Sequence, residues 1–181
     1  MKMNLISKIT LLSAVCGGLL SPGANAQEEK PVFSSVTVDL GIVVGDMDAS
    51  VKFYTEALGV KEVKGFTASA EKASAFGLTD NLEAVIRVLV LGEGPGATKL
   101  KLMSFPESKP AKPDQKFIHS TIGVSYLTIR VTDMDVALKR LADSKVKLMG
   151  KTPANLSGKT YLTTVQDPDG NFIELIGPRA E

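Results

Sequence analysis

The sequence predicts an α+β fold made of two tandem copies of one module, in which a strand and a helix are followed by three further strands. An internal repeat is the main evidence. Residues 39–52 and 126–139 match at seven of fourteen positions with a constant offset of 87. Further along, residues 100–102 align with residues 173–175 at an offset of 73, so the first copy is longer by 14 residues. Because order, spacing and hydrophobic pattern recur together, they indicate a duplicated module.

Local patterns predict each element of the first copy. Residues 36–44 are rich in β-branched residues and predict a strand, after which Asp46 is suited to cap a helix. One face of that helix carries Met47, Val51, Tyr54 and Leu58. Gly59 suits its C-terminal end. The remaining predicted elements are a strand at 60–66, a short helix at 68–76, strands at 84–91 and 99–105, and a hairpin loop at 92–96.

The second copy repeats this order after a segment without periodicity. Residues 106–120 combine prolines, lysines and small residues, and they predict a linker. Residues 123–131 then predict a strand, and Asp133 predicts the cap of a helix. One face of that helix carries Met134, Leu138 and Leu141. The later predicted elements are a short strand at 146–149, a strand at 161–166, a turn at 167–170 and a last strand at 171–176.

The N-terminal residues predict an exported precursor with a signal peptide at 1–26. A short basic start precedes the apolar run 9–20, and Ala-Asn-Ala at 24–26 is a small-residue cleavage site. This run of 12 residues is shorter than the ~20 that a membrane-spanning helix needs. A valine precedes Cys16, where lipid-anchored proteins have a small residue. We therefore expect cleavage, and a secreted or periplasmic protein.

The predicted domain organisation follows from these boundaries. A leader covers 27–34 and a single domain covers 35–178, divided into module one at 35–105, the linker at 106–120 and module two at 121–178. Removing 26 residues from 181 leaves 155, enough for one domain with a sizeable core. The full chain has a net charge of +1 and the signal contributes +2, so the remainder carries −1. This balance favours neither a nucleic acid nor a membrane surface as a partner. The remainder also lacks cysteine, which excludes disulfides and thiolate chemistry.

Three motifs resemble those of the vicinal oxygen chelate superfamily, which includes glyoxalases, bleomycin-resistance proteins and dioxygenases. In this sequence they are VGD at 44–46, FYTEALG at 53–59 and DPDGNFIEL at 167–175. The resemblance covers about residues 35–178. It implies that the two modules form a cupped mixed sheet around one cavity, and that subunits pair as a homodimer. It does not identify the reaction, because one fold supports many chemistries.

The resemblance also implies where a metal ion would bind in metal-using relatives. The four ligand positions fall on Asp39, Lys101, Tyr126 and Glu174, and the only histidine, His119, matches none of them. Asp39 and Glu174 are able to bind a divalent ion. A phenol is a poor ligand at neutral pH, and a lysine ammonium has only donors and repels a cation. We therefore expect a metal-free polar cluster with no cofactor, in which Lys101 pairs with the carboxylates.

Three functions remain open. The protein would bind a small organic ligand through Asp39, Lys101, Tyr126 and Glu174, with Arg87 as a further anion-binding residue. Alternatively, it would be a lyase or isomerase of the glyoxalase I or methylmalonyl-CoA epimerase type, which abstracts a proton next to a carbonyl. Lys101, Glu174 and Tyr126 would then be catalytic. A third alternative is a structural or interaction domain with a degenerate site. The aromatic pair at 53–54 and the turn at 167–171 are interpreted as packing and structure.

Overall fold

A computed structural model describes residues 32–179 of the chain. The predicted signal peptide at 1–26 and the first part of the predicted leader lie outside these residues. From Ser35 onward the described chain forms one compact unit. Within the described range, no helix is long and apolar enough to cross a membrane.

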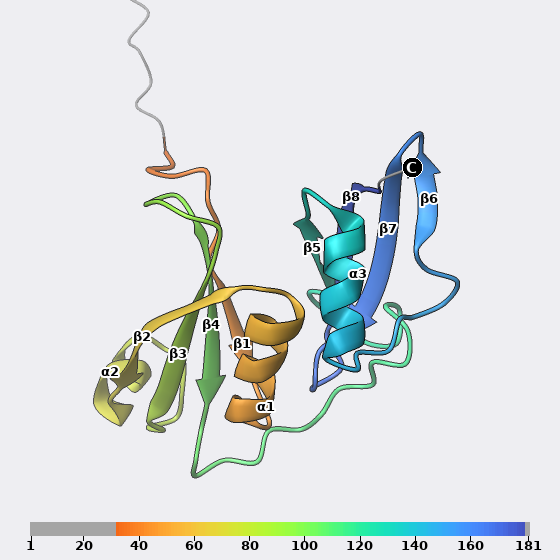
Figure 1. The fold of residues 1–181 in the computed structure, drawn as a ribbon. Helices are drawn as coiled ribbons and strands as arrows, with labels where there is room; N and C mark the ends of the chain where they lie inside the picture. Colours follow the sequence, from red (N-terminus) through yellow and green to blue (C-terminus); the bar gives the residue numbers. More distant parts are fainter. Residues whose placement is uncertain (1–31, 180–181) are drawn as a thin grey trace, which may run out of the picture. The chain divides into compact units, whose positions relative to one another are not determined.

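The first module forms a four-stranded mixed sheet (Figure 1). Its elements in chain order are β1 (Leu40–Val43), α1 (Met47–Lys52), the π-helix η1 (Phe53–Ala57), β2 (Lys61–Ala68), α2 (Ala70–Ala75), β3 (Ala84–Leu91) and β4 (Thr98–Ser104). The strand order is β1-β4-β3-β2. β1 is parallel to β4, whereas the other neighbours are antiparallel.

The second module has the same topology. It consists of β5 (Tyr126–Arg130), α3 (Met134–Asp143), β6 (Ala154–Ser157), β7 (Thr160–Gln166) and β8 (Phe172–Pro178). Its strand order is β5-β8-β7-β6, with β5 parallel to β8. The predicted α+β fold with two strand–helix–three-strand modules is therefore confirmed. Among residues 32–179 no strand pairing joins the two sheets, so the mixed sheet consists of two separate four-stranded halves.

The predicted helix caps are confirmed in both modules. Asp46 Oδ1 accepts a hydrogen bond from the amide of Ala49 at 2.9 Å. Asp133 Oδ1 accepts bonds from the amides of Asp135 at 2.8 Å and Val136 at 3.1 Å. Each aspartate thus satisfies amide groups that the first turn of a helix leaves without partners.

The first helix differs from the expectation at its C-terminal end. After α1 it continues as η1, in which the amide of Leu58 donates to the carbonyl of Phe53 at 3.3 Å. The chain then turns at Gly59, whose φ of +80° is the conformation expected for a glycine after a helix. The wider π-helical turn was not predicted, because the hydrophobic spacing fits an ordinary helix equally well.

Two strand predictions need correction, and one strand was not predicted. The predicted strand at 146–149 is wrong, since this segment makes a single backbone bond to β7, from the amide of Met149 to the carbonyl of Thr164 at 2.8 Å. On the side away from β8, β7 pairs with β6, which the sequence did not predict. Residues 36–39 are not part of β1, because the β4 pairing starts at Leu40.

One hydrophobic core contains residues of both modules. Its fully buried members include Tyr54, Leu89 and Leu102 from the first module and Met134, Leu141 and Ile173 from the second. Helix α3 contacts η1, and Arg140 Nη2 donates to the carbonyl of Thr55 at 3.0 Å. Since Phe53 and Tyr54 are both buried in this core, their interpretation as packing residues is confirmed.

Candidate functional site

Strand alternation defines the face of each sheet that would form the cup. Leu100 and Leu102 of β4, like Ile173 and Leu175 of β8, point into the core that the helices cover. Because side chains along a strand alternate between the two faces, Lys101 and Glu174 point to the opposite face. We call this face, turned away from α1 and α3, the cup face.

On the first module, the cup face carries an ion pair. Lys101 Nζ lies 3.1 Å from Asp39 Oδ2, and the backbone amide of Lys99 donates to Asp39 Oδ1 at 3.2 Å. Both side chains are little more than one-third exposed. The hydrogen bond from Lys101 lowers the pKa of Asp39 below its ordinary value, against the opposing effect of its desolvation. The lysine thus keeps this carboxylate ionised.

On the second module, the cup face is polar along β5 and β8. Thr128 Oγ1 donates to Glu174 Oε2 at 2.9 Å, and Tyr126 lies two residues before Thr128 on the same face of β5. Thr128 and the exposed Arg130, which follows it on this face, were not among the predicted site residues. The sequence could have identified both residues, because residues at positions i+2 and i+4 from Tyr126 lie on the same face of a strand as Tyr126.

A cleft between β1 and β5 brings part of the predicted set together. It has a volume of about 410 Å³ and is lined by residues 38–43, 124–127, Asn171 and Phe172. Asp39 and Tyr126 therefore line one cavity, with Lys101 bound to Asp39. Glu174 lies on the second sheet with Thr128, and no ion pair joins it to Lys101 within residues 32–179. The structure thus arranges the four residues as two polar groups.

Arg87 lies elsewhere. It pairs with Leu102 across β3 and β4, which places it on the helix-covered face. Its guanidinium binds Glu62 through two bonds of 2.6 and 2.8 Å and Asp48 through one of 2.8 Å. The hydrogen bonds from Arg87 lower the pKa of Glu62, and Glu62 in turn raises the pKa of Arg87. Arg87 is therefore not brought to the cup face with the other four residues.

The donor set of the cup does not fit a divalent cation. Asp39, the one carboxylate in the cleft between β1 and β5, is paired with an ammonium. In the part of the chain that the structure describes, no three His, Cys, Asp or Glu side chains are grouped so as to hold a metal ion. A lysine offers no lone pair when protonated, so binding a metal ion at Asp39 would require breaking the ion pair with Lys101.

The turn at 167–171 fixes the start of β8, and with it Glu174. Asp167 Oδ1 accepts bonds from the amides of Asp169 at 3.0 Å and Asn171 at 2.8 Å. Gly170 has a φ of +95°, as expected for a glycine in a tight turn. Asp169 reaches the first module, where its carboxylate accepts from the amide of Gly45 at 3.1 Å. The structural interpretation of this turn is confirmed, and the turn also connects the two modules.

Comparison with known families gives one match. The model of the glyoxalase/bleomycin resistance protein/dioxygenase superfamily matches residues 36–175. No curated protein matches the sequence.

Several solved structures share the fold. A glyoxalase family protein from Bacillus cereus superposes with a TM-score of 0.67 at 18% identity, over 85% of this chain and 99% of the other. A trypanothione-dependent glyoxalase I from Leishmania major superposes with a TM-score of 0.54 at 26% identity, over 77% of this chain and 84% of the other. A glyoxalase family protein from Enterococcus faecalis has a TM-score of 0.54 at 20% identity, over 76% and 94% respectively.

Proposed function

Since this chain belongs to the glyoxalase/bleomycin resistance protein/dioxygenase superfamily, we propose that it binds a small organic ligand on its cup face without the help of a metal ion. The observation that carries the proposal is the ion pair between Lys101 and Asp39 beside the cleft between β1 and β5. The ammonium of Lys101 occupies the place where the resemblance puts a metal ligand.

The cleft has the composition expected of a small-molecule site. Apolar side chains such as Leu40, Val124 and Phe172 form most of its wall, while Asp39 and Tyr126 supply polar groups. Pockets of this kind bind organic ligands through apolar contact, and a few polar groups fix the orientation. Tyr126 would donate a hydrogen bond to a ligand oxygen, and Lys101 would contribute positive charge.

A thermal-shift screen tests this proposal. The purified protein is screened with small carbonyl compounds, aromatic acids and antibiotics, with and without Ni²⁺, Zn²⁺ or Mn²⁺. We expect a ligand that raises the melting temperature without added metal, and we expect Lys101→Ala to reduce this shift. Lys61→Ala, an exposed lysine on β2 outside the cleft, is the matched control. Tight stoichiometric metal binding, or a shift unchanged in Lys101→Ala, would contradict the metal-free proposal.

A lyase or isomerase activity is the second candidate. It is favoured by the similarity to the Leishmania major glyoxalase I, at 26% identity. In this case Glu174 would take the proton next to a carbonyl, and Lys101 or Tyr126 would stabilise the developing negative charge on the oxygen. We expect such an enzyme to exchange the α-proton of acetoin for deuterium in heavy water, as measured by proton NMR. Exchange that persists in Glu174→Gln would contradict this role of Glu174.

We also propose that the protein acts outside the cytoplasm after loss of residues 1–26, and that it forms a homodimer. The first proposal rests on the basic, apolar and small-residue segments of the N-terminal sequence. N-terminal sequencing of the protein from a periplasmic or culture fraction tests it, with Gln27 as the expected first residue. Retention of the whole chain in the cytoplasm would contradict export.

A further inference from the structure

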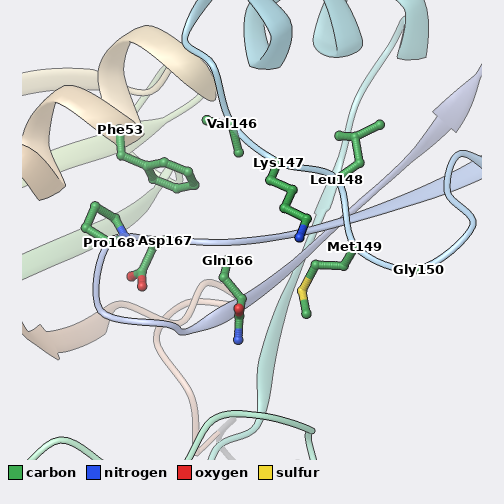
Figure 2. A pocket seen from close by; sticks show the side chains of 9 residues that line it. All are labelled: Phe53, Val146, Lys147, Leu148, Met149, Gly150, Gln166, Asp167 and Pro168. Carbon is green, nitrogen blue, oxygen red and sulfur yellow. The ribbon is translucent and has the colours of Figure 1, made fainter.

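A second cavity lies outside the cup, beside the C-terminal end of β7 (Figure 2). Its volume is about 610 Å³, and its lining consists of Phe53, residues 146–150 and residues 166–168. The cavity is next to the place where the predicted strand at 146–149 fails to form. Only Met149 bonds to β7 here, and the rest of the segment borders the cavity.

The cavity exposes an unpaired edge of β7. The carbonyl of Thr164 accepts a bond from the amide of Met149 at 2.8 Å, so the backbone groups of Thr164 point away from β8. In an antiparallel ladder, residues whose N–H and C=O groups point outward recur at every second position. Gln166 lies two residues after Thr164 on β7, so its backbone groups also point away from β8. Within residues 32–179 neither its N–H nor its C=O has a hydrogen-bond partner.

Lys147 gives the cavity a positive charge. Figure 2 shows its side chain extending from the loop toward the side of the cavity where Gln166 and Met149 lie. Lys147 is exposed, and it forms no ion pair with any carboxylate of residues 32–179. An ammonium without a counter-ion at the side of a cavity is suited to bind a carboxylate.

The remaining walls are mostly apolar, and the carboxylate oxygens of Asp167 are occupied by hydrogen bonds. The apolar side chains are those of Phe53, Val146, Leu148, Met149 and Pro168. The carboxylate of Asp167 accepts bonds from the hydroxyl of Tyr54 and from the Nδ2 group of Asn171, at 2.9 and 2.8 Å, in addition to its two backbone bonds. Its oxygens are therefore committed to the turn, and Lys147 is the cationic side chain among the described residues that line the cavity.

We propose that this cavity binds a small carboxylic acid that carries an amide group, such as an N-acylated amino acid. The amide of the ligand pairs with the backbone N–H and C=O of Gln166, as one residue of an added strand would. The ligand carboxylate binds Lys147, and an apolar side chain packs against Phe53 and Met149. This site is separate from the cup, so the proposal does not depend on the function assigned to the cup.

An NMR titration of the purified protein with N-acetyl-L-leucine tests the proposal. We expect the amide signals of Gln166 and Met149 to shift, and we expect Lys147→Gln to weaken binding about tenfold, the loss expected for one charge-assisted hydrogen bond. Lys151→Gln removes the same charge from the same loop, but Lys151 does not line the cavity, so its affinity should equal that of the wild type. Since both lysines are exposed, neither change should disturb the rest of the spectrum.

Two analogues separate the proposed contacts. The methyl ester of N-acetyl-L-leucine lacks the carboxylate, and 4-methylpentanoate lacks the amide, so both should bind more weakly than the parent compound. The proposal is overturned if millimolar N-acetyl-L-leucine leaves Gln166 unshifted, or if Lys147→Gln binds as well as the wild type. Shifts confined to Tyr126 and Glu174 would also overturn it, because they would place the ligand in the cup.

Discussion

Tyr54 donates its hydroxyl hydrogen to Asp167 Oδ2 at 2.9 Å, and this bond connects the first helix of one module to the β7–β8 turn of the other. The tyrosine is fully buried and the aspartate is 5% exposed. Burial, followed by the negative charge of Asp167, raises the pKa of Tyr54 far above its usual range. The phenol therefore stays protonated and remains a donor at any physiological pH.

Removing this hydroxyl should weaken the contact between the modules. Tyr54→Phe leaves Asp167 with one donor fewer in a buried position, and we expect the free energy of unfolding to fall by about 1–2 kcal/mol. Urea denaturation followed by circular dichroism measures this change. Tyr161→Phe is the control, because no hydrogen bond of the Tyr161 hydroxyl is found in the described chain, and its effect should stay below about 0.5 kcal/mol. Equal effects of the two substitutions would contradict the role given to Tyr54.

The ion pair at the cup predicts a pH dependence. Lys101 lowers the pKa of Asp39 in the folded protein, so the stability that the pair contributes is present above the unfolded pKa of about 3.9. That contribution is lost as the pH falls through the lower, folded value. Carbon-13 NMR of the side-chain carboxyl should show Asp39 titrating below its usual range, and Lys101→Met should raise this pKa. A titration of Asp39 that Lys101→Met does not change would contradict the pairing.

Arg87 should matter for stability. Its side chain and that of Glu62 are each about one-third exposed, so solvent screens part of their attraction. We expect Arg87→Met to lower the free energy of unfolding by about 1 kcal/mol through the loss of its pairs with Glu62 and Asp48. Lys64→Met, an exposed lysine on β2, should have little effect. Because Arg87 lies on the helix-covered face, the ligand-induced thermal shift should be unchanged in Arg87→Met. Loss of the thermal shift in this variant would show that Arg87 contacts the ligand.

The proposed homodimer gives a further prediction. Ile122 and Val124 precede β5 and are both exposed, and solvent-exposed apolar residues in close succession favour association. We expect light scattering after size exclusion to give twice the mass of one chain. The double substitution of Ile122 and Val124 by serine should shift the protein toward the monomer, whereas Phe76→Ser, at an exposed residue elsewhere, should not. A monomer at every concentration would contradict the dimer.

Most of the fold could be predicted from the sequence because it rests on local signals that occur twice. Asp46 and Asp133 cap equivalent helices, and β3 and β8 are both rich in apolar residues. The error at 146–149 has a different origin. A segment with three apolar residues among four fits a short strand, but a strand requires a partner along its whole length. Only tertiary structure reveals that this segment reaches β7 at Met149 alone.

The candidate site was harder to predict than the fold. The resemblance supplied the positions of Lys101 and Asp39, and the structure places these two side chains in contact. The resemblance could not supply the hydrogen-bond partner of Glu174. Thr128 lies on a neighbouring strand, and the sequence of neither strand determines the register between them. The sequence also did not determine on which face of the sheet Arg87 lies. A strand with apolar residues on both faces, such as β3, does not reveal which face the helices cover.

The linker at 106–120 contains no helix or strand, yet it is the one covalent connection between two complete sheets. The modules also contact each other through the shared core and the hydrogen bonds of Tyr54 and Asp169. The linker therefore acts mainly by keeping the two halves at a high effective concentration. A chain cut by a protease in this exposed segment should remain associated, and the halves, produced as separate polypeptides, should reassemble when mixed.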